Sequence, residues 1–145
     1  VTVEYVDQKR KKSFLHHVSC GARCFLARVN GTIVAFHFAI DTPYTDPTSG
    51  VTITPRPGEI YQFDGEIKRE ERGKVYGIQQ MDWYFNKIRS EGYHTVLALV
   101  DKANKASFRF HTRLGFVPVQ SCRIYRICGW NFIRWGKREP PPPLA

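Results

Sequence analysis

An Asn-Gly pair between two apolar runs constrains this chain more than any other feature of its sequence. Asn30-Gly31 separates residues 24–29 from residues 33–40. Both central positions of a type I′ turn need a positive φ, which Asn and Gly tolerate better than other residues. The sequence therefore predicts a tight antiparallel hairpin, around which the rest of any sheet has to be built.

The other elements are predicted from periodicity and from residues that begin and end helices. Apolar residues at helical spacing predict a helix over 75–90, ended by Gly92, and Asn104 is predicted to cap another helix, ended by Gly115. Gly65 lies inside a strand, where glycine indicates a bulge or a close approach to the backbone. In chain order we expect a strand at 1–5, a basic helix from Asp7 to about 18, the hairpin, a loop at 41–58 with an extended piece at 51–53, a strand at 59–67, the helix 75–90, a doubly buried strand at 95–100, the capped helix, and strands at 117–127 and 130–135. This order predicts an α/β (α+β) domain around one mixed sheet.

Length and composition limit the kind of protein. The chain has 145 residues, which we assign to one domain at 1–136 and a proline-rich tail at 137–145. No apolar run approaches the roughly 20 residues of a membrane span, and the first residues do not resemble a signal peptide. We therefore expect a cytoplasmic protein without a membrane partner. The spacing of the cysteines fits no common zinc site, so no metal is expected; they are Cys20, Cys24, Cys122 and Cys128.

The charge of the chain favours an anionic partner, and one loop suggests where it binds. The formal net charge is +9, which suits nucleic acid, a membrane surface or a phosphorylated cofactor. Residues 72–77, Arg-Gly-Lys-Val-Tyr-Gly, lie between a predicted strand and a predicted helix. The first amides of that helix lack intrahelical acceptors and, with the helix dipole, Arg72 and Lys74, they would form an anion site. A solvated basic turn is the alternative interpretation of the same residues.

A second segment, residues 104–116, reads NKASFRFHTRLGF and follows the predicted buried strand. Together the two segments resemble the GNAT superfamily of acyl-CoA N-acyltransferases. The first family signature, [R/Q]-x-x-G-x-[G/A], is similar to residues 72–77, where Arg72 and Gly77 match and Val75 replaces the middle glycine. The resemblance covers residues 23–135.

The second family signature is N-x-x-A-x-x-x-Y-x-x-x-G-F. Asn104, Gly115 and Phe116 match it, whereas Ser107 replaces the alanine and His111 replaces the tyrosine. The resemblance implies a mixed, mostly antiparallel central sheet with a V-shaped splay between two central strands, flanked by helices.

The resemblance also implies a cofactor, acetyl-CoA or another acyl-CoA. The strand ending at residue 67 would splay from the strand 95–100, and the pantetheine arm would pair with backbone in the gap. The residues expected to bind CoA are Gly65, Glu66, Ile67, Arg72, Gly73, Lys74, Val75, Tyr76, Gly77, Asn104 and His111.

Acyl transfer to an amine is helped by a base for the amine proton and an acid for the departing thiolate. The family places a tyrosine at the acid position, where this chain has His111, whose imidazole titrates near neutral pH. A half-buried helix histidine without a catalytic role fits the same position. Asp64, Glu59 and Glu66 are candidate bases on a strand whose alternation places them on different faces. We select Asp64, because it lies beside the predicted bulge.

The resemblance is incomplete before the hairpin. The family has two helices there, and only residues 7–22 are present, enough for one short helix. An abbreviated lid, a partner subunit or a fragment of a longer protein would each account for this. The acceptor is expected to be a small-molecule or peptide amine, and a homodimer is compatible with the sequence.

Two other functions remain open. The first is a CoA-binding module of the same fold without catalysis, favoured by the substitutions at Val75 and His111. The second, which we do not expect, is a nucleic-acid-binding domain, favoured by Trp130 and Trp135 beside Arg134 and by the net charge. Turnover of acyl-CoA separates the enzyme from the binding module.

Overall fold

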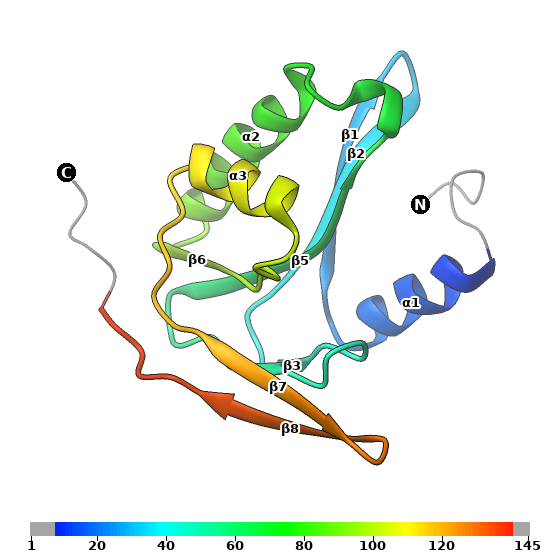
Figure 1. The fold of residues 1–145 in the computed structure, drawn as a ribbon. Helices are drawn as coiled ribbons and strands as arrows, with labels where there is room; N and C mark the ends of the chain where they lie inside the picture. Colours follow the sequence, from blue (N-terminus) through cyan, green and yellow to red (C-terminus); the bar gives the residue numbers. More distant parts are fainter. Residues whose placement is uncertain (1–7, 141–145) are drawn as a thin grey trace. The chain divides into compact units, whose positions relative to one another are not determined.

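The computed structural model describes residues 8–140, which contain three α-helices and eight strands (Figure 1). The predicted strand at 1–5 and the capping role of Asp7 lie outside the described residues. The elements are α1 (Gln8–Ser19), β1 (Arg23–Val29), β2 (Thr32–Ile40), β3 (Tyr44–Thr45), β4 (Thr52–Ile53), β5 (Glu59–Ile67), α2 (Tyr76–Ser90), β6 (Thr95–Ala98), α3 (Lys105–Arg113), β7 (Cys122–Ile127) and β8 (Trp130–Trp135). They form two compact units. The first unit consists of two segments, the chain up to Tyr44 and the segment Ile53–Leu99. The second unit consists of Thr45–Thr52 and the chain from Val100 onward.

The first unit is built on a four-stranded mixed sheet in the order β1-β2-β5-β6. β1 and β2 form the predicted hairpin, with φ of 50° at Asn30 and 79° at Gly31, as a type I′ turn requires. β2 pairs antiparallel with β5, whereas β5 pairs parallel with β6. The mixed, mostly antiparallel sheet expected from the sequence is confirmed.

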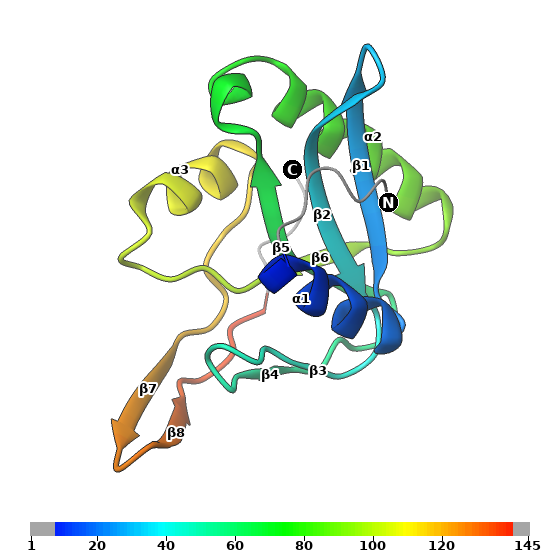
Figure 2. The ribbon, with the colours of Figure 1, turned by 90° about the vertical axis from the view of Figure 1, so that its right-hand side faces the viewer.

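Helices α1 and α2 cover opposite faces of this sheet, α1 in front of it and α2 behind it in Figure 2. Side chains alternate along β2, so Phe36 and Phe38 both pack against Phe14 of α1, with ring centroids 4.9 Å away in each case. His37, between them in sequence, packs behind the sheet, with its ring centroid 4.4 Å from that of Tyr84 of α2. Each helix therefore buries one apolar face against its own side of the sheet.

A bulge in β5 lies where the sequence predicted one. Phe38 pairs with Phe63 and Phe36 pairs with Glu66. Between these two pairs β5 advances by three residues and β2 by two, so β5 contains one extra residue. The residue with left-handed backbone is Asp64, at φ 45°, and not Gly65. Gly65 serves close packing instead, because a Cβ on it would lie 3.3 Å from Cβ of His37. The bulge is confirmed, and its strained residue is the one beside the glycine.

Strand β6 is shorter and more exposed than predicted. The apolar run at 95–100 predicted a strand buried on both faces, but the strand is Thr95–Ala98, partly exposed throughout, at the edge of its sheet. It pairs with β5 from Glu59 to Gln62 only, and β5 then continues to Ile67. Among the described residues no strand pairs with this edge of β5 beyond Gln62. This opening corresponds to the predicted splay.

The second unit contains helix α3 and the hairpin β7–β8. The Asn104 side chain caps α3 as predicted, accepting a hydrogen bond of 3.1 Å from the Ser107 amide. The strand predicted at 117–127 begins only at Cys122, because Pro118 lacks the N–H that a strand ladder needs. The strand at 130–135 is confirmed as β8. In the tail, the Glu139 amide still donates to the Val119 carbonyl at 2.8 Å.

Candidate functional site

The loop between β5 and α2 presents backbone donors at the start of a helix. A 3₁₀ turn at Arg69–Glu71 leads to α2, which begins at Tyr76. In the described structure, the amides of Val75, Tyr76 and Gly77 donate to no backbone acceptor. Lys74 differs from the prediction, since its amide donates to the Glu71 carbonyl at 3.2 Å. The predicted run of donors at 74–77 is therefore reduced to the last three residues.

The charged side chains of this loop are partly engaged. Arg72 Nε donates to the Ile67 carbonyl at 3.1 Å, which ties the loop to the end of β5. Lys74 Nζ lies 2.9 Å from Glu71 Oε2, and this hydrogen bond raises the pKa of Lys74. Because Lys74 is exposed, its ion pair with Glu71 is weak and would exchange readily for a stronger anion.

The bulge brings two acidic residues of β5 to the α1 side of the sheet. Asp64 Oδ2 lies 3.0 Å from His17 Nε2 of α1, and Glu66 forms an ion pair with Arg10 of the same helix. Asp64 and Glu66 are two residues apart, so strict alternation also places them on one face, but on the face opposite Phe63. The bulge brings both to the side of Phe63 and α1 instead. Glu59 lies at the other end of β5, where Oε2 accepts from the Arg56 amide at 2.9 Å.

The sequence interpretation missed His17, the closest partner of Asp64. His17 is only 2% exposed, and its ring nitrogens are fully engaged. Nε2 lies 3.0 Å from Asp64 Oδ2 and 3.0 Å from Ser13 Oγ, and Nδ1 lies 2.8 Å from the Tyr44 hydroxyl. The signal available in the sequence was Phe14 with His17, three residues apart on the apolar face of the helix, but it does not reveal the partner on β5.

A second buried histidine, His37, lies on the opposite face of the sheet. Its Nδ1 is 3.3 Å from Gln80 Nε2, whereas its Nε2 has no hydrogen-bond partner in the described structure. Burial lowers the pKa of His37 to about 4, so the ring is neutral near pH 7. His37 is therefore a packing residue, stacked on Phe25 at 5.2 Å.

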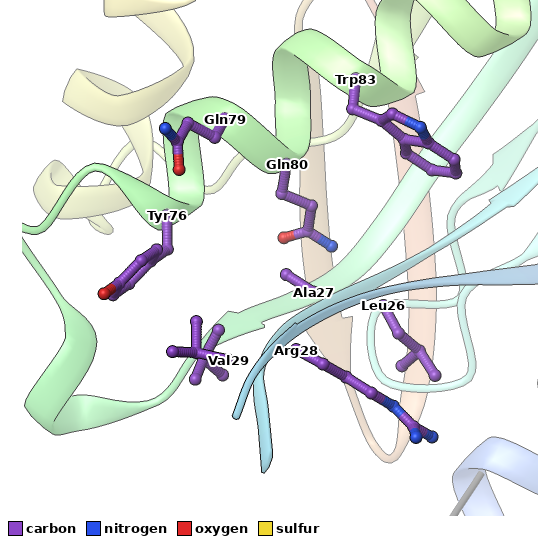
Figure 3. A pocket seen from close by; sticks show the side chains of 9 residues that line it. Leu26, Ala27, Arg28, Val29, Tyr76, Gln79, Gln80 and Trp83 are labelled. Atoms are coloured by element: carbon purple, nitrogen blue, oxygen red, sulfur yellow. The ribbon is translucent and has the colours of Figure 1, made fainter. Parts of the chain in front are cut away.

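A pocket of about 220 Å³ lies between β1 and α2, away from Asp64. The pocket is lined on the α2 side by Tyr76, Gln79, Gln80 and Trp83, and Figure 3 shows Gln80 pointing toward Ala27 of β1. Gln80 Nε2 also donates to the Phe25 carbonyl at 3.1 Å, which fixes its side chain to the strand. Tyr76 is the one predicted site residue among the residues lining this pocket.

The second unit holds the two remaining predicted site residues, Asn104 and His111. The Asn104 side chain is used as a helix cap. His111 Nδ1 lies 2.8 Å from the Ser107 carbonyl, which can only accept, so Nδ1 carries a proton. In the neutral ring Nε2 then holds the lone pair, and His111 can donate a proton from Nε2 only as imidazolium.

The described residues give no support for a metal centre or a membrane span. Among residues 8–140 no group of three or more His, Cys, Asp or Glu side chains could hold a metal ion. The cysteines are free thiols. In the same part of the chain, no helix combines the length and the apolarity needed to cross a bilayer.

Comparison with known families decides the identity of the fold. Residues 3–116 match the model of the acetyltransferase (GNAT) family. The chain belongs to the GNAT family. The resemblance inferred from the two loop-helix segments is thus confirmed, and so is the GNAT-like mixed sheet.

Solved structures agree on the GNAT fold. An N-acetyltransferase from Staphylococcus aureus Mu50 is similar at a TM-score of 0.57 and 18% identity, over 88% of this chain and 72% of the other. An aminoglycoside N-acetyltransferase in complex with CoA is similar at a TM-score of 0.56 and 16% identity, over 83% of this chain and 92% of the other. At these identities the likeness describes the fold.

One similar curated protein is a Pseudomonas paraeruginosa L-methionine sulfoximine/L-methionine sulfone acetyltransferase, 34% identical over 70 residues. The match spans 48% of this chain and 38% of the Pseudomonas protein. The GNAT chain described here therefore corresponds to well under half of that relative.

Proposed function

We propose that this GNAT chain is an acetyl-CoA-dependent N-acetyltransferase that acts on a primary amine. The observation that carries the proposal is the open edge of β5, which leads through a basic loop into the unbonded amides at the start of α2. A strand edge can pair with an extended chain that contains amides, and a helix start can bind phosphate. Acetyl-CoA joins a diphosphate to a pantetheine arm, so one molecule would satisfy both parts.

The residues present fit this cosubstrate. The amides of Val75, Tyr76 and Gly77 would bind the diphosphate, with Arg72 and Lys74 beside it and Gly73 shaping the turn. The backbone of Gly65, Glu66 and Ile67 would pair with the pantetheine arm. For Asn104 and His111, which belong to the second unit, a role toward CoA is proposed from the second family signature alone, and Asn104 also caps α3.

Acetyl-CoA supplies an acetyl group as a thioester. The amine nitrogen attacks the thioester carbonyl, the new N–C bond forms, and the C–S bond breaks. Asp64 is proposed to take the proton that the amine nitrogen loses, and a backbone N–H at 65–67 to donate to the carbonyl oxygen. The thiolate then receives a proton from the His111 imidazolium or from water.

The inactive CoA-binding module is the alternative, and the structure of the loop weakens one argument for it. Val75 replaces the usual middle glycine, yet its φ is −65° and its ψ is −21°, which any residue adopts. Its side chain is 54% exposed. The backbone conformation at this position does not require glycine, so valine leaves the conformation of the loop between β5 and α2 intact.

The acceptor is proposed by analogy with the relative. The Pseudomonas protein is named for L-methionine sulfoximine and L-methionine sulfone, and these two compounds are the first acceptors to test. We further propose that residues 1–136 act as one acyltransferase domain, that the protein is cytoplasmic, and that a small-molecule or peptide amine is its partner.

Binding and turnover test this proposal together. Acetyl-CoA at one hundred times its Kd should raise the free energy of unfolding by about 2.7 kcal/mol, and Tm by several degrees. A panel of primary amines that includes both methionine derivatives should yield acetylated product by mass spectrometry. Asp64→Asn should lower kcat by about 10²- to 10⁴-fold without changing the Kd of CoA.

Asp82→Asn is the matched control, since Asp82 is exposed on α2, away from β5, and loses the same charge. It should leave kcat unchanged. A folded sample that shows no Tm shift at millimolar acetyl-CoA would exclude the cosubstrate. Binding without acetylation of any amine in the panel would identify the inactive module instead.

A further inference from the structure

The surroundings of His17 assign its protons. A carboxylate can only accept, so the 3.0 Å contact makes His17 Nε2 the donor to Asp64 Oδ2. In the neutral ring Nδ1 is then the acceptor, and the Tyr44 hydroxyl at 2.8 Å donates to it. Ser13 Oγ lies 3.0 Å from Nε2 and can accept from the same N–H. The hydrogen bonds therefore run in one direction, from Tyr44 through His17 to Asp64.

Packing holds this ring in one orientation. Aromatic rings surround His17, with centroids 4.8 Å away for Phe38, 5.0 Å for Phe63 and 5.8 Å for Tyr44. A ring that is 2% exposed and bonded at both nitrogens cannot turn without leaving buried polar atoms unpaired. His17 therefore presents its N–H to a fixed point beside β5.

That fixed point is where the bulge brings Asp64. One carboxylate oxygen, Oδ2, is held by His17, whereas Oδ1 has no hydrogen-bond partner in the described structure. The Asp64 side chain is 36% exposed, against 3% for His17. One oxygen is anchored in the protein, and the other is open to a ligand.

We propose that His17 is a positioning residue for Asp64, oriented by Tyr44, and that it aims Oδ1 at the acceptor amine. This inference rests on the proposed N-acetyltransferase function. The proton lost by the attacking amine nitrogen goes to Oδ1, while Oδ2 keeps its hydrogen bond from His17 Nε2. Helix α1 thus contributes to catalysis through His17.

A pair of substitutions at one position separates positioning from packing. His17→Phe keeps an aromatic ring in the cluster and removes both hydrogen bonds, so kcat should fall about 10- to 100-fold, with KM for acetyl-CoA unchanged. His17→Gln places an amide N–H near the position of Nε2 and should recover kcat to within about threefold of the unchanged protein. His16→Phe, at the exposed neighbouring position, is the control and should have no effect.

The tautomer of His17 gives a readout that packing alone would not produce. Nitrogen-15 NMR of histidine-labelled protein should show the proton of His17 on Nε2. Tyr44→Phe removes one hydroxyl and keeps the ring. The Asp64 carboxylate still requires the Nε2–H tautomer, but Nδ1 loses its donor and the ring is held less firmly, so kcat should fall. If His17→Phe fails to fold, Tyr44→Phe provides the same test.

The assays use acetyl-CoA with L-methionine sulfoximine, or with whichever panel amine the unchanged protein acetylates. Full kcat in both His17→Phe and Tyr44→Phe would overturn the positioning role and leave the proposed function standing. Equal losses of kcat in His17→Phe and His17→Gln would also overturn the positioning role. So would an Nδ1–H tautomer of His17 in the unchanged protein. An unchanged protein that acetylates nothing refutes the proposed function itself, before any variant is made.

Discussion

At the scale of single residues, His17 and His37 show how one sheet gives two histidines different environments. Both rings are buried, but His17 is bonded at both nitrogens, whereas Nε2 of His37 has no partner in the described structure. Burial alone therefore governs the protonation of His37, whose pKa falls to about 4 from an ordinary value of 6.5.

This difference predicts a pH-dependent stability. Between pH 6.5 and about 4 the unfolded chain binds a proton at His37 that the folded chain does not bind. The contribution of neutral His37 is fully present above pH 6.5 and is lost as the pH falls toward 4, by up to about 3 kcal/mol. Urea unfolding at a series of pH values should show a weaker decline for His37→Phe than for the unchanged protein.

At neutral pH the same variant should have nearly unchanged stability. Phenylalanine can keep the stacking on Phe25, and it removes an N–H that has no acceptor. Gln80 keeps its hydrogen bond to the Phe25 carbonyl. Identical pH profiles for the two proteins would show that His37 is solvated and titrates normally in the folded state.

At the scale of elements, the loop between β5 and α2 contains a competition for Lys74. Glu71 already pairs with Lys74, so a bound diphosphate would have to displace or share this contact. Lys74→Ala should weaken CoA binding by only about two- to fivefold, since the charge is exposed and screened by solvent. Glu71→Gln should act in the opposite direction and tighten CoA binding, because the competing carboxylate is gone.

Calorimetry with CoA and with pantetheine locates these effects. Neither variant should change pantetheine binding, since pantetheine lacks the diphosphate. Lys87→Ala, which removes the same charge in the last turn of α2, should change neither affinity. A loss of pantetheine affinity in Lys74→Ala would place Lys74 outside the phosphate site.

The sequence predicted most helices and strands correctly, but it did not predict which side chains of different elements contact each other. Turn chemistry fixed β1 and β2, and a single glycine located the bulge in β5, because both depend on local backbone preferences. The partnership of His17 with Asp64 joins residues 47 positions apart and arises only when α1 docks on the sheet. The length and the burial of β6 were overestimated for a related reason, since an apolar run does not reveal which strands will pair with it.

At the scale of the whole molecule, the chain crosses between its two compact units three times, after Tyr44, Thr52 and Leu99. Neither unit is one continuous segment, so neither can be cut from the chain and fold as a simple fragment. If residues 1–136 form one domain, as we propose, both units should unfold in a single transition.

The three tryptophans allow this to be measured unit by unit. Trp83 belongs to the first unit, and Trp130 and Trp135 belong to the second. Fluorescence of Trp83→Phe therefore follows the second unit alone, and fluorescence of a Trp130→Phe, Trp135→Phe double variant follows the first. Circular dichroism gives the overall urea midpoint of each variant. In each variant the fluorescence midpoint of the remaining unit should coincide with this overall midpoint. Two separated midpoints would divide the chain into two domains.

Asp64 also has a consequence for protein engineering. A non-glycine residue at φ 45° carries about 1–3 kcal/mol of backbone strain, which glycine at the same position would largely relieve. A redesign guided by backbone strain alone would therefore select glycine at position 64 and discard both the carboxylate and its hydrogen bond from His17. Stabilised variants of this acetyltransferase fold should be chosen with position 64 held fixed, because relief of the strain there would be a loss of the proposed base.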